Sequence, residues 1–206
     1  MTLGSAPVRR LGIFGGSFDP PHASHGLLAQ AALEQLQLDR LLVVPTGQAW
    51  HKHRPLTDAR HRVAMARLAF DGLPGVQIDT REVDRAGPSY TIDTLRALQV
   101  EYPQAELFLV IGQDQAQALP SWREWEQVVS LATIAVASRA EQAAANPIPY
   151  QPPESLRQRF RQLQMPVSDT SATAIRQRAS QGLRIDALVG EPVARYIALH
   201  RLYQTI

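Results

Sequence analysis

A short apolar run that ends in two glycines, followed by two histidines where a helix should begin, constrains this chain more than any other feature. The run covers residues 11–14, and the segment Gly15–Gly26 reads GGSFDPPHASHG. Glycines let the backbone turn sharply and approach a ligand, and a helix N-terminus offers N–H groups with partial positive charge. His22 and His25 share one helix face because they are three residues apart. The segment therefore predicts a strand, a turn and a helix start that bind phosphate.

Strand-length apolar runs alternate with segments of helical periodicity along the chain, which is typical of a parallel sheet with crossover helices. We expect strands at Arg10–Phe14, Leu41–Val44, Val76–Val83, Leu107–Ile111 and Thr133–Ala137, with a short sixth near Pro166 and Val167. We expect helices at His25–Leu38, at Ala59–Phe70 after the cap candidate Thr57, and from Thr91 to just before Pro103.

The expected fold class is α/β: a Rossmann-like central parallel sheet flanked by helices, with a small helical C-terminal portion at about residues 154–206. Residues 1–206 are expected to form a single domain, in which the proline-rich segment Glu141–Pro153 is a connection. Strand order 3-2-1-4-5 would place the first and fourth strands together at the switch point, where ligands bind. The Gly15 loop and Ile111–Asp114 leave these two strands and should face one cleft.

Composition narrows the class of protein. At 206 residues, 22.8 kDa and 45% hydrophobic residues, the chain can bury a sizeable core. No run approaches the roughly 18 apolar residues of a membrane span and no signal-peptide core is evident, so we expect a cytoplasmic protein. Zero cysteines exclude disulfides and thiolate chemistry. The pI is about 9.3, but the net charge is only +2 and the arginines are scattered, so we expect no nucleic-acid partner.

A second phosphate-binding candidate lies near the C-terminus. Ser171–Arg176 reads SATAIR and opens a predicted helix, where hydroxyl and N–H groups can hold phosphates and Arg176 adds a fixed positive charge. Taken alone, this segment is better explained by simple capping by Ser171, but its pairing with the first motif, about 150 residues earlier, favours phosphate binding. Lys52, the only lysine of the chain, lies in a His-Lys-His-Arg loop and offers a compact ammonium.

Two turns carry aromatic residues suited to a flat ligand: Pro88–Thr91 reads PSYT and Pro120–Trp122 reads PSW. A ring in a turn can stack on a heterocycle while neighbouring N–H and hydroxyl groups meet a carboxylate. A place in the core is the alternative for Tyr90 and Trp122. Asp114 suits a ribose hydroxyl or a helix N-cap equally.

These motifs together resemble the nucleotidyltransferase superfamily of adenylyltransferases and cytidylyltransferases, and within it the bacterial nicotinate-nucleotide adenylyltransferases. Gly15–Gly26 is similar to the GxFDPxHxGH signature, with Ser24 in place of a glycine, and Ser171–Arg176 is similar to the ISSTxIR element. The IGxD, PSYT and PxW elements extend the resemblance over nearly the whole chain. The residues His51 and Lys52 match a Pro-Pro-His-Lys loop in which Ala49 and Trp50 replace the prolines.

The resemblance implies adenylyl transfer from ATP to nicotinate mononucleotide, giving deamido-NAD and pyrophosphate, with Mg²⁺ carried mainly by the ATP phosphates. It implies catalytic roles for His22, His25, Lys52 and Arg176. The residues expected to bind ATP are Gly15, Gly16, Ser17, Phe18, His22, His25, Gly112, Asp114, Ser171, Thr173 and Arg176. The residues expected to bind substrate are Ser17, Lys52, Tyr90, Thr91, Trp122 and Arg139. Arg139 is expected near the adenosine side and is followed by Ala140 where proline is common.

Other interpretations stay open at this point. The two histidines could form a structural helix start or half of a metal site that lacks a third ligand. The acceptor could be nicotinamide mononucleotide, phosphopantetheine or FMN, although the PSYT and PSW turns argue against the last two. A non-enzymatic nucleotide-binding or RNA-binding module is the alternative of a different class. The oligomeric state is not readable from the sequence.

Overall fold

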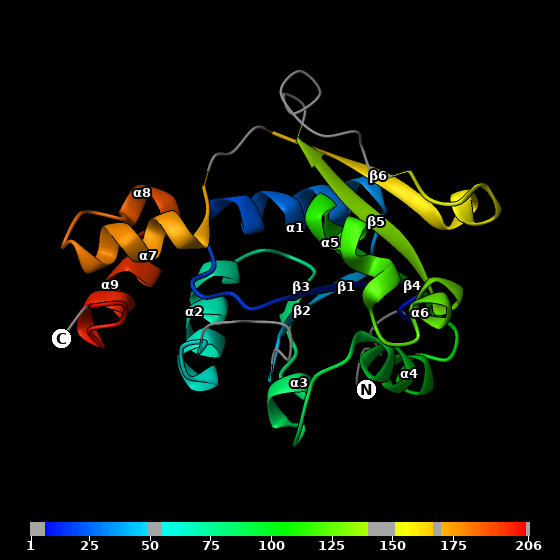
Figure 1. The fold of residues 1–206 in the computed structure, drawn as a ribbon, viewed down its shortest axis with the longest axis horizontal. Coiled ribbons are helices and arrows are strands. Elements are labelled where there is room, and N and C mark those ends of the chain that lie inside the picture. Colours follow the sequence, from blue (N-terminus) through cyan, green and yellow to red (C-terminus); the bar gives the residue numbers. More distant parts are fainter. Residues whose placement is uncertain (1–6, 49–54, 140–150, 167–169, 205–206) are drawn as a thin grey trace, which may run out of the picture.

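The computed structural model describes residues 7–48, 55–139, 151–166 and 170–204. Within these ranges the chain forms a six-stranded parallel sheet of order β3-β2-β1-β4-β5-β6 (Figure 1). The strands are β1 (Arg10–Gly16), β2 (Arg40–Pro45), β3 (Val76–Ile78), β4 (Glu106–Gly112), β5 (Ala132–Arg139) and β6 (Phe160–Met165). The expected order 3-2-1-4-5 is confirmed, and β6 extends the sheet beyond β5.

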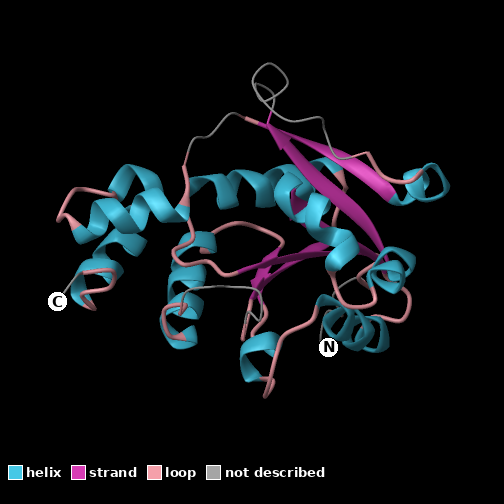
Figure 2. Ribbon diagram, in the orientation of Figure 1, coloured by secondary structure: helices cyan, strands magenta, loops and turns pink. Residues whose placement is uncertain are grey.

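Helices cover both faces of this sheet (Figure 2). They are α1 (Ala23–Gln35), α2 (Ala59–Phe70), α3 (Arg81–Asp84), α4 (Thr91–Glu101), α5 (Gln113–Ala118), α6 (Trp125–Leu131), α7 (Ala172–Ser180), α8 (Asp186–Val189) and α9 (Glu191–Leu199). Short 3₁₀ helices occupy Leu119–Ser121 and Glu154–Arg159. None of the helices in the described ranges has the length and apolar character that a bilayer crossing requires.

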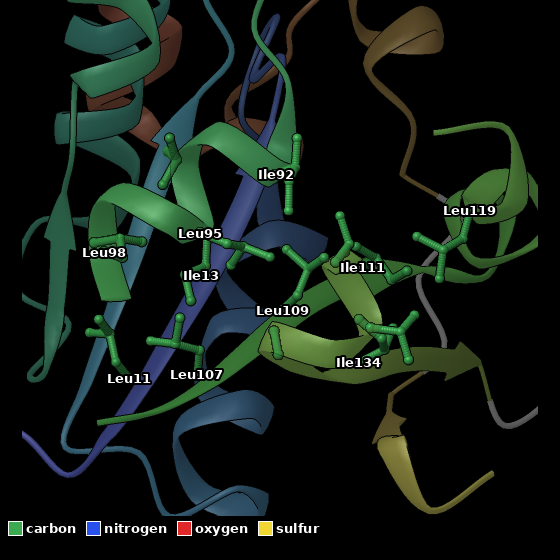
Figure 3. Close-up of a cluster of buried hydrophobic side chains, with 14 of the residues drawn as sticks. Leu11, Ile13, Ile92, Leu95, Leu98, Leu107, Leu109, Ile111, Leu119 and Ile134 are labelled. Carbon is green, nitrogen blue, oxygen red and sulfur yellow. The ribbon is translucent and has the colours of Figure 1, made fainter. Parts of the chain in front are cut away.

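The central strands are apolar on both faces, as a sheet between two helical layers requires. Leu11 and Ile13 of β1 pack with Leu107 and Leu109 of β4 in a cluster covered by α4, α5 and α6 (Figure 3). The alternate residues, such as Phe14, face a second cluster formed with α1 and α2. This arrangement fixes β1 and β4 side by side in the middle of the sheet.

A third cluster attaches the C-terminal helices to the sheet. Met65 of α2 packs against Ile175, Val193 and Ile197, so α7 and α9 lie beside α2 (Figure 1). The region expected to be a helical portion, residues 154–206, thus begins with a 3₁₀ helix and β6 before it reaches these helices. The described C-terminus lies on this side of the sheet.

The limits of two expected elements were wrong for local reasons. Strand β3 ends at Ile78, because the Asp79 carboxylate accepts the Arg81 N–H at 2.9 Å and starts α3 where the strand was expected to continue. Helix α1 stops before Leu38 because Gln37 has φ of +49°, outside the helical region.

Two other expectations also need correction. Asp58, not Thr57, caps α2, accepting from the Arg60 N–H at 2.9 Å. The sixth strand lies before Pro166, with Leu163 and Met165 buried between exposed glutamines, and Val167 is outside the described residues.

Gly47, in the loop after β2, is expected to tolerate no side chain. A Cβ at this position would overlap the carbonyl oxygen of Glu82 in α3, and backbone atoms cannot move aside as side-chain ends can. Gly47→Ala should lower the free energy of unfolding by roughly 1–3 kcal/mol in urea denaturation. Gly26→Ala is the control, because its Cβ would meet open space in α1 and alanine favours a helix. Equal stability of the two variants would contradict this packing.

Candidate active site

A cavity of about 370 Å³ opens at the carboxyl ends of β1 and β4. Gly15 and Gly16 line it from β1, and Gly112 lines it from the end of β4. Tyr90 and Trp122 also line it. The expected meeting of the two loops across one cleft is confirmed, since the switch point brings these strands together.

The turn between β1 and α1 is buried and held by aromatic packing. Phe18 is 1% exposed, has φ of +46° and packs edge-on against Phe14 with ring centroids 5.4 Å apart. Its ring also lies 5.1 Å from that of His25. Left-handed backbone costs roughly 1–2 kcal/mol for a non-glycine residue, which this burial offsets. The Phe18 side chain therefore supports His25 and does not line the cavity.

The two histidines lie together at the start of α1, with ring centroids 3.8 Å apart. The backbone N–H of His22 donates to Nδ1 of His25 at 3.1 Å, and the N–H of His25 donates to the His22 carbonyl at 2.8 Å. An Nδ1 atom that accepts from an amide carries no proton, so the neutral ring bears its proton on Nε2. Burial, together with the neighbouring His22, holds the pKa of His25 well below its usual value. His25 is thus a neutral Nε2–H donor on the cavity wall.

The second motif lies against this turn. Arg176 donates from Nη1 to the carbonyl oxygen of Asp19 at 2.8 Å, across 157 residues of sequence. Its Nη2 donates to the Thr173 hydroxyl at 3.0 Å. Ser171 is the N-cap of α7 and accepts from the Ala174 N–H at 3.2 Å. The structure thus joins the two sequence motifs, and the capping role of Ser171 is confirmed.

The predicted aromatic residues also contribute to the cavity lining. Tyr90, Thr91 and Trp122 line the cavity, and the rings of Tyr90 and Trp122 also pack against the adjacent core. The Arg123 guanidinium lies 4.7 Å from the centroid of the Tyr90 ring, a cation–π distance. Tyr90 is also the N-cap residue of α4, so the first amides of that helix lie at this wall.

Comparisons with known proteins agree with this geometry. Residues 13–178 match a family model described as cytidylyltransferase-like. The chain is 54% identical to a probable nicotinate-nucleotide adenylyltransferase of Albidiferax ferrireducens over 96% of this chain and 100% of that protein. The same name is given to a protein of Methylibium petroleiphilum that is 44% identical over 98% of this chain and 95% of its own. This chain belongs to the nicotinate-nucleotide adenylyltransferase family.

The family fold is also found among solved structures. Plasmodium falciparum nicotinic acid mononucleotide adenylyltransferase, complexed with NaAD, superposes with a TM-score of 0.72 at 20% identity, covering 95% of this chain and 97% of that chain. At that identity the likeness establishes the fold alone. The Rossmann-like nucleotidyltransferase class expected from the sequence is confirmed.

Some expected residues are not brought to the cavity wall of this adenylyltransferase. Asp114 is exposed and does not line the cavity, and the N-cap of α5 is Gly112, so the capping alternative for Asp114 was wrong. Ser24 is 9% exposed in the first turn of α1 and lines no part of the cavity. Lys52, with Ala49 and Trp50, is outside the described residues, and so is the Arg139 side chain.

Sequence reasoning missed two buried charged residues. Glu82 lines the cavity, accepts from the Thr94 hydroxyl at 2.8 Å, and has a raised pKa because burial disfavours its charge. Arg62, 2% exposed, donates to the carbonyl groups of Thr57, Ser17 and Gly47 at 2.8, 3.0 and 3.4 Å. The apolar periodicity around Arg62 in α2 was the available signal, because it places an arginine on the inward face. Within the described residues, no three or more His, Asp and Glu side chains gather as metal ligands.

We expect the environment of His25 to lower stability at mildly acidic pH. Because its folded-state pKa is depressed below 6.5, the unfolded chain binds a proton there that the folded chain does not, and the free energy of unfolding falls as the pH falls. Between about pH 7.5 and about pH 5.5, protonation of this group in the unfolded chain should lower the free energy of unfolding by roughly 1 kcal/mol. Urea denaturation of wild type and His25→Asn measures it, since asparagine can still accept from the His22 amide. Identical pH dependence in the two proteins would contradict the assignment.

Proposed function

We propose that this chain transfers the adenylyl group of ATP to nicotinate mononucleotide, forming deamido-NAD and pyrophosphate in NAD biosynthesis. The observation that carries the proposal is the Arg176 bond to the Asp19 carbonyl, which joins the second motif to the first motif, whose residues Ser17 and His25 line the cavity. The aromatic wall with Tyr90 and Trp122 supplies a separate place for a heterocycle. The names of the relatives and the NaAD complex of the Plasmodium falciparum protein support the same reaction.

The reaction requires alignment and charge stabilisation, not acid–base chemistry. A phosphate oxygen of the mononucleotide attacks the α-phosphorus of ATP, and the bond to the oxygen that bridges the α- and β-phosphates breaks in line with it. That oxygen leaves with pyrophosphate, so one P–O bond forms and one breaks. The attacking phosphate is already anionic, and no serine, cysteine or general base is needed.

The described residues suit this task. In our proposal His22 donates to the α-phosphate, where charge builds up in the transition state. His25, through its Nε2–H, acts with Thr173 and Arg176 on the leaving β- and γ-phosphates. Fixed donors stabilise the transition state without reorganisation. Glycines 15 and 16 let the triphosphate approach the backbone, and the remaining expected ATP contacts, Ser17, Asp114 and Ser171, are part of the same proposal.

The polar groups around the turn fit a reaction in which Mg²⁺ arrives bound to ATP. Imidazole, guanidinium and hydroxyl groups surround the turn, and the Asp19 carboxylate is engaged by the Tyr203 hydroxyl and the Thr57 amide. Mg²⁺ held by the ATP phosphates and water would neutralise part of the triphosphate charge. Lys52 and Arg139 are proposed to approach the reacting phosphates and the adenosine side, respectively.

On the acceptor side, Trp122 is proposed to stack on the pyridine ring. The cation–π contact with Arg123 orients Tyr90. The N-terminus of α4 carries partial positive charge beside Thr91, which favours a carboxylate over a carboxamide. This preference supports nicotinate as the acceptor, and a cytoplasmic location fits the supply of both nucleotides.

Pyrophosphate release tests the function directly. We expect release from ATP and Mg²⁺ to depend on added nicotinate mononucleotide and to be weaker with nicotinamide mononucleotide, phosphopantetheine or FMN. Release that is independent of any acceptor, or strongest with one of the other three, would contradict the proposed substrate. Binding of ATP without turnover on any acceptor would favour a non-enzymatic module.

Removal of the His22 imidazole should abolish most of the turnover. We expect His22→Ala to lower kcat by about 10²-fold or more, because a donor to the transition-state charge is lost. Steady-state kinetics measures the effect, and thermal unfolding checks that the variant is folded. His200→Ala is the matched control, since His200 is exposed and does not line the cavity. Near-normal turnover of folded His22→Ala would contradict the role.

The stacking role of Trp122 predicts a selective change in KM. Trp122→Ala should raise the KM for nicotinate mononucleotide by about tenfold or more, because stacking on an aromatic ring contributes about 1–3 kcal/mol per base. The KM for ATP should change much less. Trp125→Ala is the control: Trp125 packs against the same core but does not line the cavity, so it should affect stability and neither KM. Equal increases in both KM values for Trp122→Ala would argue against stacking.

A further inference from the structure

A tyrosine from the far end of the chain reaches the turn that carries the first motif. Tyr203, four residues after α9, donates its hydroxyl to Oδ1 of Asp19 at 2.7 Å, across 184 residues of sequence. Its hydroxyl also lies 3.9 Å from the sulfur of Met65 in α2. Tyr203 has φ of +64°, a conformation that a tyrosine adopts only when its surroundings hold it. The surrounding structure therefore holds Tyr203 in this contact with Asp19.

The acceptor of this hydrogen bond is deeply buried. Asp19 is 1% exposed, and its Oδ2 accepts from the Thr57 N–H at 3.3 Å. The carbonyl oxygen of the same residue accepts from Arg176. Burial and the neighbouring Asp19 raise the pKa of Tyr203, so the phenol keeps its proton and stays a donor. If the buried Asp19 carboxylate loses the Tyr203 donor, its desolvation is no longer offset by a hydrogen bond, and the turn must shift to find another donor.

Arg62 holds the same turn from another side. Its guanidinium donates to the carbonyl oxygens of Ser17 and Thr57. Ser17 begins the turn, and the N–H of Thr57 donates to the Asp19 carboxylate, so Arg62 links the turn to Thr57. Arg62 and Tyr203 thus act on one short segment, Ser17–Asp19, from α2 and from the end of the chain. Neither side chain lines the cavity.

We propose that Tyr203, with Arg62, is a positioning residue for the adenylyl-transfer reaction: it holds Asp19 so that His22 and Arg176 keep the spacing that binds the triphosphate. The inference rests on the proposed function, because it assigns the triphosphate to this end of the cavity. His22 lies three residues after Asp19, and Arg176 donates to the Asp19 carbonyl. A displacement of Asp19 is therefore transmitted to both.

A second tyrosine provides a matched control within the same C-terminal element. Tyr196 of α9 has its hydroxyl 2.9 Å from Nδ1 of His61 in α2, so this contact also joins the C-terminal helices to α2. The rings of His61 and His200 lie at 5.8 and 4.2 Å from the Tyr196 ring. Tyr196 makes none of the hydrogen bonds to the Ser17–Asp19 turn described above. Its removal should weaken the docking of the helices without loosening the turn directly.

The experiment compares Tyr203→Phe with Tyr196→Phe in the full chain. We expect Tyr203→Phe to lower kcat and raise the KM for ATP, each by about tenfold, because small misplacements of reacting groups are costly. Its KM for nicotinate mononucleotide should stay within about twofold, since the aromatic wall is untouched. Tyr196→Phe should leave all three values within about twofold at a similar loss of thermal stability. Equal kinetics for the two variants, or equal increases in both KM values for Tyr203→Phe, would overturn the proposal.

Two further measurements separate this role from general stability and from the reaction itself. Asp19→Ala, which removes the acceptor of the Tyr203 hydroxyl, and the double variant Asp19→Ala/Tyr203→Phe should have the same kcat, because the hydroxyl acts through Asp19; additive losses would overturn the proposal. Calorimetric binding of α,β-methylene-ATP without acceptor should be about tenfold weaker for Tyr203→Phe than for Tyr196→Phe. If wild type fails to adenylylate nicotinate mononucleotide, the proposed function fails, yet this binding comparison still decides the positioning role.

Discussion

The burial of the turn Ser17–Asp19 is the constraint on which the site depends. Phe18 and Asp19 are each 1% exposed, so the buried Asp19 carboxylate needs donors from the protein. The donors to the turn as a whole are Arg62 from α2, Arg176 from α7 and Tyr203 from beyond α9. Three parts of the chain must therefore be docked before the turn has its shape. The C-terminal helices are in this sense part of the site, although none of their residues lines the cavity.

The electrostatics of the site suit a reaction between two anions. His25 is held neutral by burial and by its neighbour His22, and its Nδ1 is already engaged, so the ring can only donate from Nε2. The guanidinium of Arg176 is fixed at the same end. Elsewhere in the cavity lining, Tyr90, Trp122 and the N-terminus of α4 offer a place for a ring with a carboxylate. In the proposed function, these groups would hold a triphosphate and a pyridine nucleotide together in this region.

Much of the fold and of the site was predictable because its signals are local. The apolar run before Gly15 and the histidine spacing after it indicated the strand, the turn and the helix start. The strand order was assumed from the Rossmann-like fold that the alternation of elements indicates, and the structure confirms it. The end of β3 and the position of β6 were missed, because a side-chain bond at Asp79 and pairing with β5 decided them.

The sequence by itself determined where a glycine turn and two helix starts suited to phosphate occur and which strands lie in the middle of the sheet. Backbone sterics, helix termini and apolar periodicity act over a few residues, and they leave a pattern that can be read along the chain. Only the tertiary structure decided that Arg62 and Tyr203 hold the turn and that Glu82 enters the cavity. A hydrogen bond between residues 184 positions apart leaves no periodic trace, because it depends on how whole helices pack against α2.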